Sequence, residues 1–179
     1  MTEEIADFMQ TLSTGVYVIG VSDGDQMNAF TASSVMPVSF KPVMLAITVG
    51  IDHASRPLLR AGKAFTVNVL KGEQMELARH FGTLSGRQVN KLAHVRWRPG
   101  GSGAPILVDT LAYIECELAS VVPAGDHELV VGKVINGEVL CREGRPLLYS
   151  ETCDLDGARN LYPAQLADVV GAHPFTVRC

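Results

Sequence analysis

The sequence has few charged side chains, and neither sign is concentrated along it. Charged residues make up 19% of the 179 residues, with 15 basic against 19 acidic side chains and a formal net charge of −4. Nucleic acids and acidic membranes are bound by clustered basic residues, so we expect neither as a partner. The longest apolar run, residues 42–51, is about half of what a membrane span needs.

The sequence also lacks a leader pattern, cysteine pairs and an abundance of aromatic residues. Its acidic start, Met1-Thr2-Glu3-Glu4, is not typical of a signal or transit peptide. The four cysteines are far apart and form no Cys-x-x-Cys pair, so we expect reduced thiols and a cytoplasmic location. Aromatic residues make up only 6%, although hydrophobic residues reach 47%. That surplus excludes disorder and suggests a subunit interface or a flat organic ligand.

Hydrophobic periodicity predicts a mainly β chain interrupted by a few helices. Strands are expected at 16–21, 27–35, 43–49, 64–70, 95–98, 111–122, 128–139 and 147–150, and helices between Thr2 and Gly15 and at 55–62, 72–81 and 163–170. Residues 82–91 are expected to form a loop and 99–105 a turn. Because hairpin turns dominate and helices do not alternate with strands, we expect an antiparallel β-barrel with peripheral helices rather than a parallel sheet.

Small and hydroxyl-bearing side chains gather near the end of the second predicted strand. They are Asn28, Ala29, Thr31, Ala32, Ser33 and Ser34. Small residues let a ligand approach the backbone amides, and hydroxyls add short hydrogen-bonding groups, so this surface would suit a flat heteroaromatic ring. The alternative is a half-exposed strand edge rich in Ser and Thr.

Two further segments could bind an anion. Asp52, His53, Ser55 and Arg56 stand where a strand gives way to a helix, whose free N–H groups favour a phosphate. His80 and Phe81 precede a loop in which Arg87 and Lys91 could add a second cation. The alternatives are a helix capped by Ser55 with a solvated arginine, and an ordinary solvated loop.

His127 lies at the tip between the two longest predicted strands, where it could meet a ligand or remain a solvated hairpin residue. Other catalytic patterns are absent from the sequence. It has no Gly-x-Ser-x-Gly elbow, no Gly-x-Gly-x-x-Gly fingerprint and no histidine spacing typical of a metal site. Nucleophilic hydrolysis and metal catalysis are therefore poorly supported.

An ordered series of segments over residues 5–150 resembles the flavin reductase family, the NAD(P)H:flavin oxidoreductases of two-component monooxygenases with an FMN-binding split-barrel fold. The series includes Ser13-Thr14-Gly15-Val16, Thr31-Ala32-Ser33-Ser34, Ser55-Arg56, Ala78-Arg79-His80-Phe81, Gly125-Asp126-His127 and Pro146-Leu147-Leu148-Tyr149. The resemblance implies a mainly β antiparallel split barrel with Greek-key connections. It also implies a homodimer with each flavin near the subunit interface.

The resemblance further implies an FMN or FAD cofactor and NADH or NADPH as co-substrate. Residues 28–34 would lie along the flavin ring and ribityl chain, residues 52–56 and 81–87 would hold the phosphate, and His127 and Tyr149 would meet the nicotinamide. Hydride would pass to the flavin, with reduced flavin supplied to a monooxygenase. A tightly bound FMN electron carrier and a non-catalytic binding module remain alternatives.

The chain departs from the family after Tyr149. Family members often end with a basic and aromatic stretch, whereas Ser150-Glu151-Thr152-Cys153-Asp154 is acidic. An altered donor, or none, is therefore an alternative. We expect residues 1–150 to form the barrel domain and residues 151–179 to form an extension packed on that domain or on the dimer partner.

Overall fold

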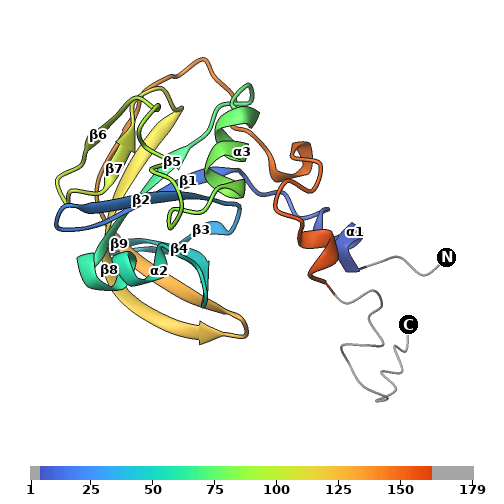
Figure 1. Ribbon diagram of the computed structural model, residues 1–179, viewed down its shortest axis with the longest axis horizontal. Helices are drawn as coiled ribbons and strands as arrows, with labels where there is room; N and C mark the ends of the chain where they lie inside the picture. Colours follow the sequence, from blue (N-terminus) through green and yellow to red (C-terminus); the bar gives the residue numbers. More distant parts are fainter. Residues whose placement is uncertain (1–4, 163–179) are drawn as a thin grey trace.

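Antiparallel strands dominate the computed structural model, which describes residues 5–162 (Figure 1). The strands are β1 (Tyr17–Asp23), β2 (Gln26–Ala32), β3 (Val35–Phe40), β4 (Val43–Gly50), β5 (Ala64–Val69), β6 (Trp97–Pro99), β7 (Pro105–Leu107), β8 (Ala112–Ala124) and β9 (His127–Val139). Seven of them form one sheet in the order β2-β1-β5-β8-β9-β4-β3, and β6 pairs with β7. The predicted mainly β antiparallel fold is confirmed.

Within residues 5–162, three short α-helices and two 3-10 helices surround this sheet. They are α1 (Ile5–Met9), α2 (Arg56–Gly62), α3 (Met75–Thr83), η1 (Tyr149–Glu151) and η2 (Ala158–Asn160). The first helix was predicted to continue to Gly15 and is wrong beyond Met9, because residues 10–15 turn toward β1 and Gly15 bridges Leu148. The predicted helix at 163–170 and the candidate cap Thr2 lie outside the described residues.

The predicted strand at 27–35 is wrong in one respect that shapes the site. β2 ends at Ala32, and a separate strand, β3, starts at Val35 and pairs with β4. Pro37 obscured β3 in the sequence, because proline lacks the N–H that a central strand needs; β3 is an edge strand, where proline is tolerated. Ser33 and Ser34 therefore form a break between two strands that belong to opposite edges of the sheet.

Two smaller predictions are also corrected. The predicted turn region, 99–105, ends within a strand: Pro105–Leu107 form β7, whose partner β6 supplies hydrogen bonds that the sequence pattern did not reveal. The predicted last strand, 147–150, is reduced to the single bridge between Leu148 and Gly15, and η1 begins at once.

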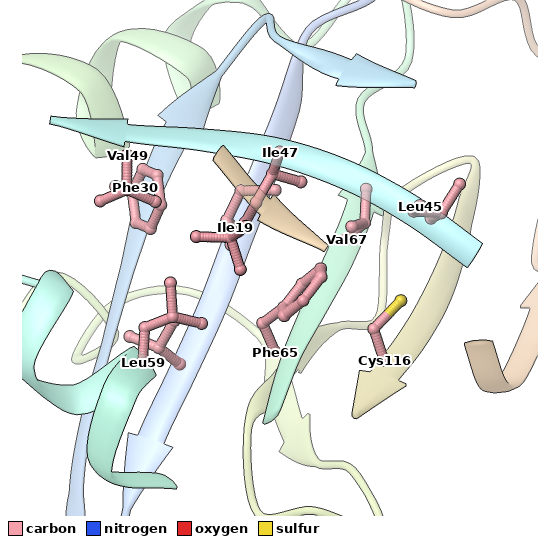
Figure 2. Packing of buried hydrophobic residues seen from close by; sticks show 11 residues of the cluster. Ile19, Phe30, Leu45, Ile47, Val49, Leu59, Phe65, Val67 and Cys116 are labelled. Atoms are coloured by element: carbon pink, nitrogen blue, oxygen red, sulfur yellow. The ribbon is translucent and has the colours of Figure 1, made fainter. Parts of the chain in front are cut away.

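The sheet curls around an apolar core. β8 has irregular register with β9 between Glu115 and Cys116 and again between Leu118 and Ser120, and such bulges bend a strand. Figure 2 shows Ile19, Phe65, Val67 and Ile47 converging on the interior. Burial also raises the pKa of the Cys116 thiol in this core to about 12, so it is not a nucleophile.

The sheet brings distant segments to one end of the molecule. The last residues of β2 and β4, the tip of the β8–β9 hairpin, α1 and the segment 149–162 meet there. Figure 1 shows α1 beside the orange and red segment that follows residue 149. A hydrogen bond of 2.9 Å from the Tyr149 N–H to the Thr14 carbonyl oxygen joins the start of η1 to the segment between α1 and β1. Within residues 5–162 no helix is long and apolar enough to span a membrane.

Candidate functional site

A cavity of about 860 Å³ opens at this end of the sheet, and we call it the strand-end cavity. Its walls come from residues 30–34, 48–50, 124–127 and 149–162, with α1 at one side. Among the predicted site residues, it gathers Thr31, Ala32, Ser33, Ser34, His53, His127 and Tyr149.

The break between β2 and β3 forms one wall with small side chains. Ser33 and Ser34 follow the last residue of β2 that pairs with β1, and their side chains make no hydrogen bond to other groups within residues 5–162. Thr31 is anchored instead, because its hydroxyl donates to the Ala78 carbonyl oxygen at 2.7 Å. This wall therefore offers two hydroxyls that a ligand can engage.

His53 lies at the back of the cavity in a neutral form. Its ring packs against Phe30 with centroids 4.5 Å apart, and its Nδ1 accepts a hydrogen bond of 3.2 Å from the Ser55 N–H. Burial, together with the positive charges of Lys91, Arg87 and His127, lowers the pKa of His53 to about 4. With Nδ1 as acceptor, the ring proton is on Nε2 at neutral pH.

His127 stands at the mouth of the cavity and is oriented by its neighbour. Its Nδ1 lies 2.8 Å from Asp126 Oδ1, and this hydrogen bond lowers the pKa of Asp126. His127 pairs in register with Gly50 of β4, where a side chain would approach the imidazole Nε2. The imidazole is thus held at the rim with Nε2 available to a ligand.

The opposite wall comes from the segment after Tyr149. The Tyr149 hydroxyl donates to Asp156 at 3.0 and 3.2 Å, and burial and the Asp156 charge raise the pKa of Tyr149. Arg145 holds the base of this segment through two 2.8 Å contacts to Glu151. Sequence reasoning missed the cavity contacts of residues 155–162, since no motif there pointed to a ligand.

The predicted anion-binding residues make contacts with one another and with the barrel. Ser55 stands at the N-cap position of α2, but the predicted hydroxyl cap is wrong: the Ser55 Oγ accepts from Asn28 Nδ2 at 3.0 Å, and both residues are buried. Arg56 contacts Glu128 at 2.7 Å, and Arg60 binds the same carboxylate. These arginines lower the pKa of Glu128 to about 2. The Arg56 Nε is buried and has no hydrogen-bond partner in the described chain.

A second cavity, of about 930 Å³, lies under residues 86–97, and we call it the loop cavity. It holds Asn28, Arg87 and Lys91 from the predicted set. Lys91 is only 3% exposed, and its Nζ donates to the Phe81 carbonyl oxygen at 3.0 Å. Burial lowers the pKa of Lys91 to about 8.

The remaining predicted residues line neither cavity. They are Ala29, Asp52, Ser55, Arg56, His80 and Phe81. Ala29 and Phe81 are buried in the apolar cluster beneath α3, and the His80 Nε2 donates to the Lys91 carbonyl oxygen at 2.7 Å. The Asp52 carbonyl oxygen accepts from Arg87 Nη2 at 3.2 Å, so residues 52–53 connect the loop to the strand-end cavity.

The chain is similar to several flavoproteins. It is 33% identical over 144 residues to the high molecular weight rubredoxin of Moorella thermoacetica, covering 79% of this chain and 62% of that protein. A putative diflavin flavoprotein of Nostoc is 40% identical over 129 residues, which cover 72% of this chain and 22% of the relative. The chain therefore spans less than two thirds of the length of these curated relatives.

The fold of the chain is also similar to that of a solved structure. The NADH:FAD oxidoreductase SgcE6 of Streptomyces globisporus is 31% identical, with a TM-score of 0.77 over 83% of this chain and 88% of that one. SgcE6 has also been solved with NAD and FAD fragments. The model of the family described as the flavin reductase like domain matches residues 9–155. Because this match spans most of the chain, the chain belongs to the flavin reductase-like domain family.

Proposed function

We propose that this chain is a flavin-dependent oxidoreductase that holds FMN or FAD in the strand-end cavity and passes it a hydride from NADH or NADPH. The observation that carries the proposal is the convergence of Thr31 to Ser34, His127 and Tyr149 on one cavity from segments far apart in sequence. A bound flavin would supply the hydride-accepting ring, and the protein supplies binding and orientation.

The donor set of the cavity fits a flavin ring. One wall carries the small side chains of Ala32, Ser33 and Ser34, and Thr48 adds a hydroxyl near the end of β4. A planar heterocycle with carbonyl oxygens and ring nitrogens can lie flat on small residues and accept hydrogen bonds from hydroxyl and amide donors. Donors fixed in this way stabilise negative charge that develops on the ring.

The residues around β4 and α2 fit the phosphate end. Arg56 keeps one buried N–H, on Nε, without a protein partner, and Arg87 reaches the backbone of Asp52 beside the cavity. A guanidinium N–H bonds a phosphate oxygen strongly. Arg56 and Arg87 would therefore hold the phosphate, while Glu128 keeps Arg56 in place.

His127 would position the nicotinamide. Asp126 fixes the imidazole through Nδ1, which leaves Nε2 at the cavity rim for the donor's amide or ribose. Hydride transfer needs the two rings stacked at near-attack distance and requires no protein acid or base, so orientation is the main contribution of this residue. Tyr149 would border the same space from the opposite wall.

A homodimer and a monooxygenase partner belong to the same proposal. The β3–β4 hairpin exposes Met36, Val38, Phe40 and Val43, and Phe40 is 92% exposed. An apolar patch of this kind is typical of a surface that associates with another protein. We expect two chains to pack through it in the cytoplasm, and light scattering on the purified protein measures the mass. Reduced flavin would then diffuse to the monooxygenase.

A second candidate is a flavin electron carrier that keeps its FMN and receives electrons from a protein. The curated relatives favour it, because a rubredoxin and diflavin flavoproteins carry the matching region as one part of a longer chain. The acidic segment after Tyr149 also lines the cavity that a nicotinamide would enter, and its Asp156 would repel the phosphates of that donor.

Anaerobic mixing of flavin-loaded protein with NADH, and separately with NADPH, distinguishes the two. Rapid bleaching of the flavin absorbance with either donor supports the reductase, and H127A should slow it. Flavin that stays bound through gel filtration and bleaches only with a reduced protein partner supports the carrier. If the chain binds neither FMN nor FAD, both functions are excluded.

A further inference from the structure

We propose that the loop cavity binds the ADP half of FAD, so that this chain prefers FAD to FMN. This inference rests on the proposed flavin site and extends it. The loop cavity has a volume of about 930 Å³ and lies under a segment that the flavin ring and ribityl chain do not need. A second cavity of nucleotide size beside Arg87, which is proposed to bind the flavin phosphate, suits a cofactor that continues beyond that phosphate.

The charges of the loop cavity suit a diphosphate. Arg87, Lys91 and Arg96 line it, against the single carboxylate of Asp25. Lys91 uses one of its three N–H donors on the Phe81 carbonyl, and Arg96 shares its guanidinium with Asp109 at 3.0 Å. A bound diphosphate would place negative charge beside the buried ammonium group of Lys91.

Among the described side chains, those of the strand-end cavity suit a diphosphate less well than those of the loop cavity. The strand-end cavity is lined by the carboxylates of Asp126 and Asp156, and no lysine or arginine lines it among the side chains that the structure describes. A like charge repels the diphosphate, so the arm is expected to leave this cavity toward the cations.

Residues 52–53 and Arg87 link the walls of the two cavities by one hydrogen bond. His53 lines the strand-end cavity, and Arg87, which lines the loop cavity, donates to the carbonyl of the preceding residue, Asp52. One nucleotide can therefore place its ring in the first cavity and pass its phosphates over Arg87 into the second.

The wall of the loop cavity suits an adenine base. Trp97, the one tryptophan of the chain, lines the cavity at the start of β6, and a base stacks well on an indole. Gln88 and Asn90 add side-chain amides that can pair with the edge of the base. These residues contribute nothing to binding FMN.

The first test compares FMN, FAD and ADP on the apoprotein. We expect FAD to bind roughly tenfold more tightly than FMN, which corresponds to the stacking and phosphate contacts that ADP adds. ADP should quench the Trp97 emission and displace FAD more readily than FMN. Equal affinities for FMN and FAD, with no effect of ADP, overturn the inference and leave flavin binding intact; failure of both flavins to bind overturns the proposed function instead.

NADH also contains an ADP half, and a second comparison separates the two sources. If ADP quenches Trp97 but FAD binds no better than FMN, the loop cavity serves the nicotinamide donor, and the proposal for FAD is wrong. We expect FAD bound beforehand to abolish the ADP quench, whereas FMN leaves it.

The matched variants are R96Q and R98Q. Both arginines are exposed and one residue away from Trp97, but Arg98 stacks over Tyr113 and lines neither cavity. R96Q should weaken ADP and FAD by roughly fivefold and leave FMN unchanged, while R98Q should change none of them. Equal effects of the two variants overturn the assignment of the cavity.

Discussion

The strand-end cavity and the loop cavity have walls linked by the hydrogen bond from Arg87 to the Asp52 carbonyl, and they differ most in charge. The first carries hydroxyls, two histidines and the carboxylates of Asp126 and Asp156, whereas the second carries Arg87, Lys91 and Arg96 against Asp25. A nucleotide cofactor has the same two halves, a neutral heterocycle and anionic phosphates. Under the proposed assignment, the fold therefore recognises the ring in one cavity and the phosphates in the other.

The two cavities also differ in how the fold makes them. The strand-end cavity is built from the ends of β2 and β4 and the β8–β9 tip, so the sheet fixes its wall. The loop cavity is closed by a loop held by Lys91 on the Phe81 carbonyl and by Gly86, whose backbone packs directly on the Asn28 side chain. Changes in the first should affect ring binding, and changes in the second phosphate binding.

The largest expected effect is S33W. A tryptophan at this break fills the ring space, and we expect flavin affinity to fall by roughly a hundredfold because overpacking has no room to relax against the sheet. Fluorescence titration with FMN measures it. The control S33A keeps the space and should remain within a few fold of the parent chain. ADP binding to S33W should be unchanged; its loss would break the separation of the two cavities.

The next effect is that of R87Q at the boundary between the cavities. Removing the guanidinium should weaken FMN and FAD alike by roughly tenfold, since a charged hydrogen bond to a phosphate is lost. Riboflavin, which has no phosphate, should bind as before, and this serves as the internal control. R79Q, a charge loss on the exposed face of α3, should change none of the three. If R87Q lost riboflavin binding, Arg87 would contact the flavin ring, and its assignment to the phosphate would be wrong.

The pH dependence of folding stability tests whether His53 is buried and neutral in the strand-end cavity. Its pKa is lowered from 6.5 to about 4 in the folded chain, so below pH 6.5 the unfolded chain binds a proton that the folded chain does not. Folding stability should therefore fall as pH decreases from 6.5 to 4, by roughly 2 kcal/mol after allowance for partial exposure. Urea unfolding of the parent chain and H53F over this range measures the contribution. A parallel fall in both chains would contradict it.

The smallest expected effect is that of D126N at the cavity mouth. Loss of the charged partner of His127 loosens the imidazole, and we expect the KM for the nicotinamide donor to rise about threefold with flavin affinity unchanged. Steady-state kinetics measure the KM for the nicotinamide donor, and a flavin titration measures the flavin affinity separately. E138Q, on exposed β9 away from both cavities, is the control.

The strand-end cavity was largely predictable because its key residues follow local patterns. The small residues 31–34 and the hairpin tip at His127 could be recognised in short windows of sequence. The break at Ser33 and Ser34 needed the register of β3 with β4, and the wall formed by residues 155–162 needed the bridge from Gly15 to Leu148. Such pairings depend on tertiary contacts that no window contains.

In the predicted anion-binding segment, too, the local sequence pattern missed partners that are distant in sequence. Ser55 was expected to cap its helix, and Arg56 was expected to meet a phosphate or, as the alternative, to face solvent. In the structure Ser55 bonds Asn28, and Arg56 bonds Glu128, 72 residues away in sequence. Each local rule was outweighed by a buried polar partner. The sequence pointed to Arg87 and Lys91 of the loop cavity but not to Arg96 and Trp97, which join it only once residues 86–97 fold over β2.

Equilibrium dialysis with riboflavin and ADP together tests the division between the two cavities most directly. Riboflavin supplies the ring without phosphate, and ADP supplies the phosphates and base without the ring. We predict that one unmodified chain binds both at once, each with the affinity that it shows alone. Mutual exclusion of the two ligands, or binding of one with no site for the other, would contradict the assignment of ring and phosphates to separate cavities.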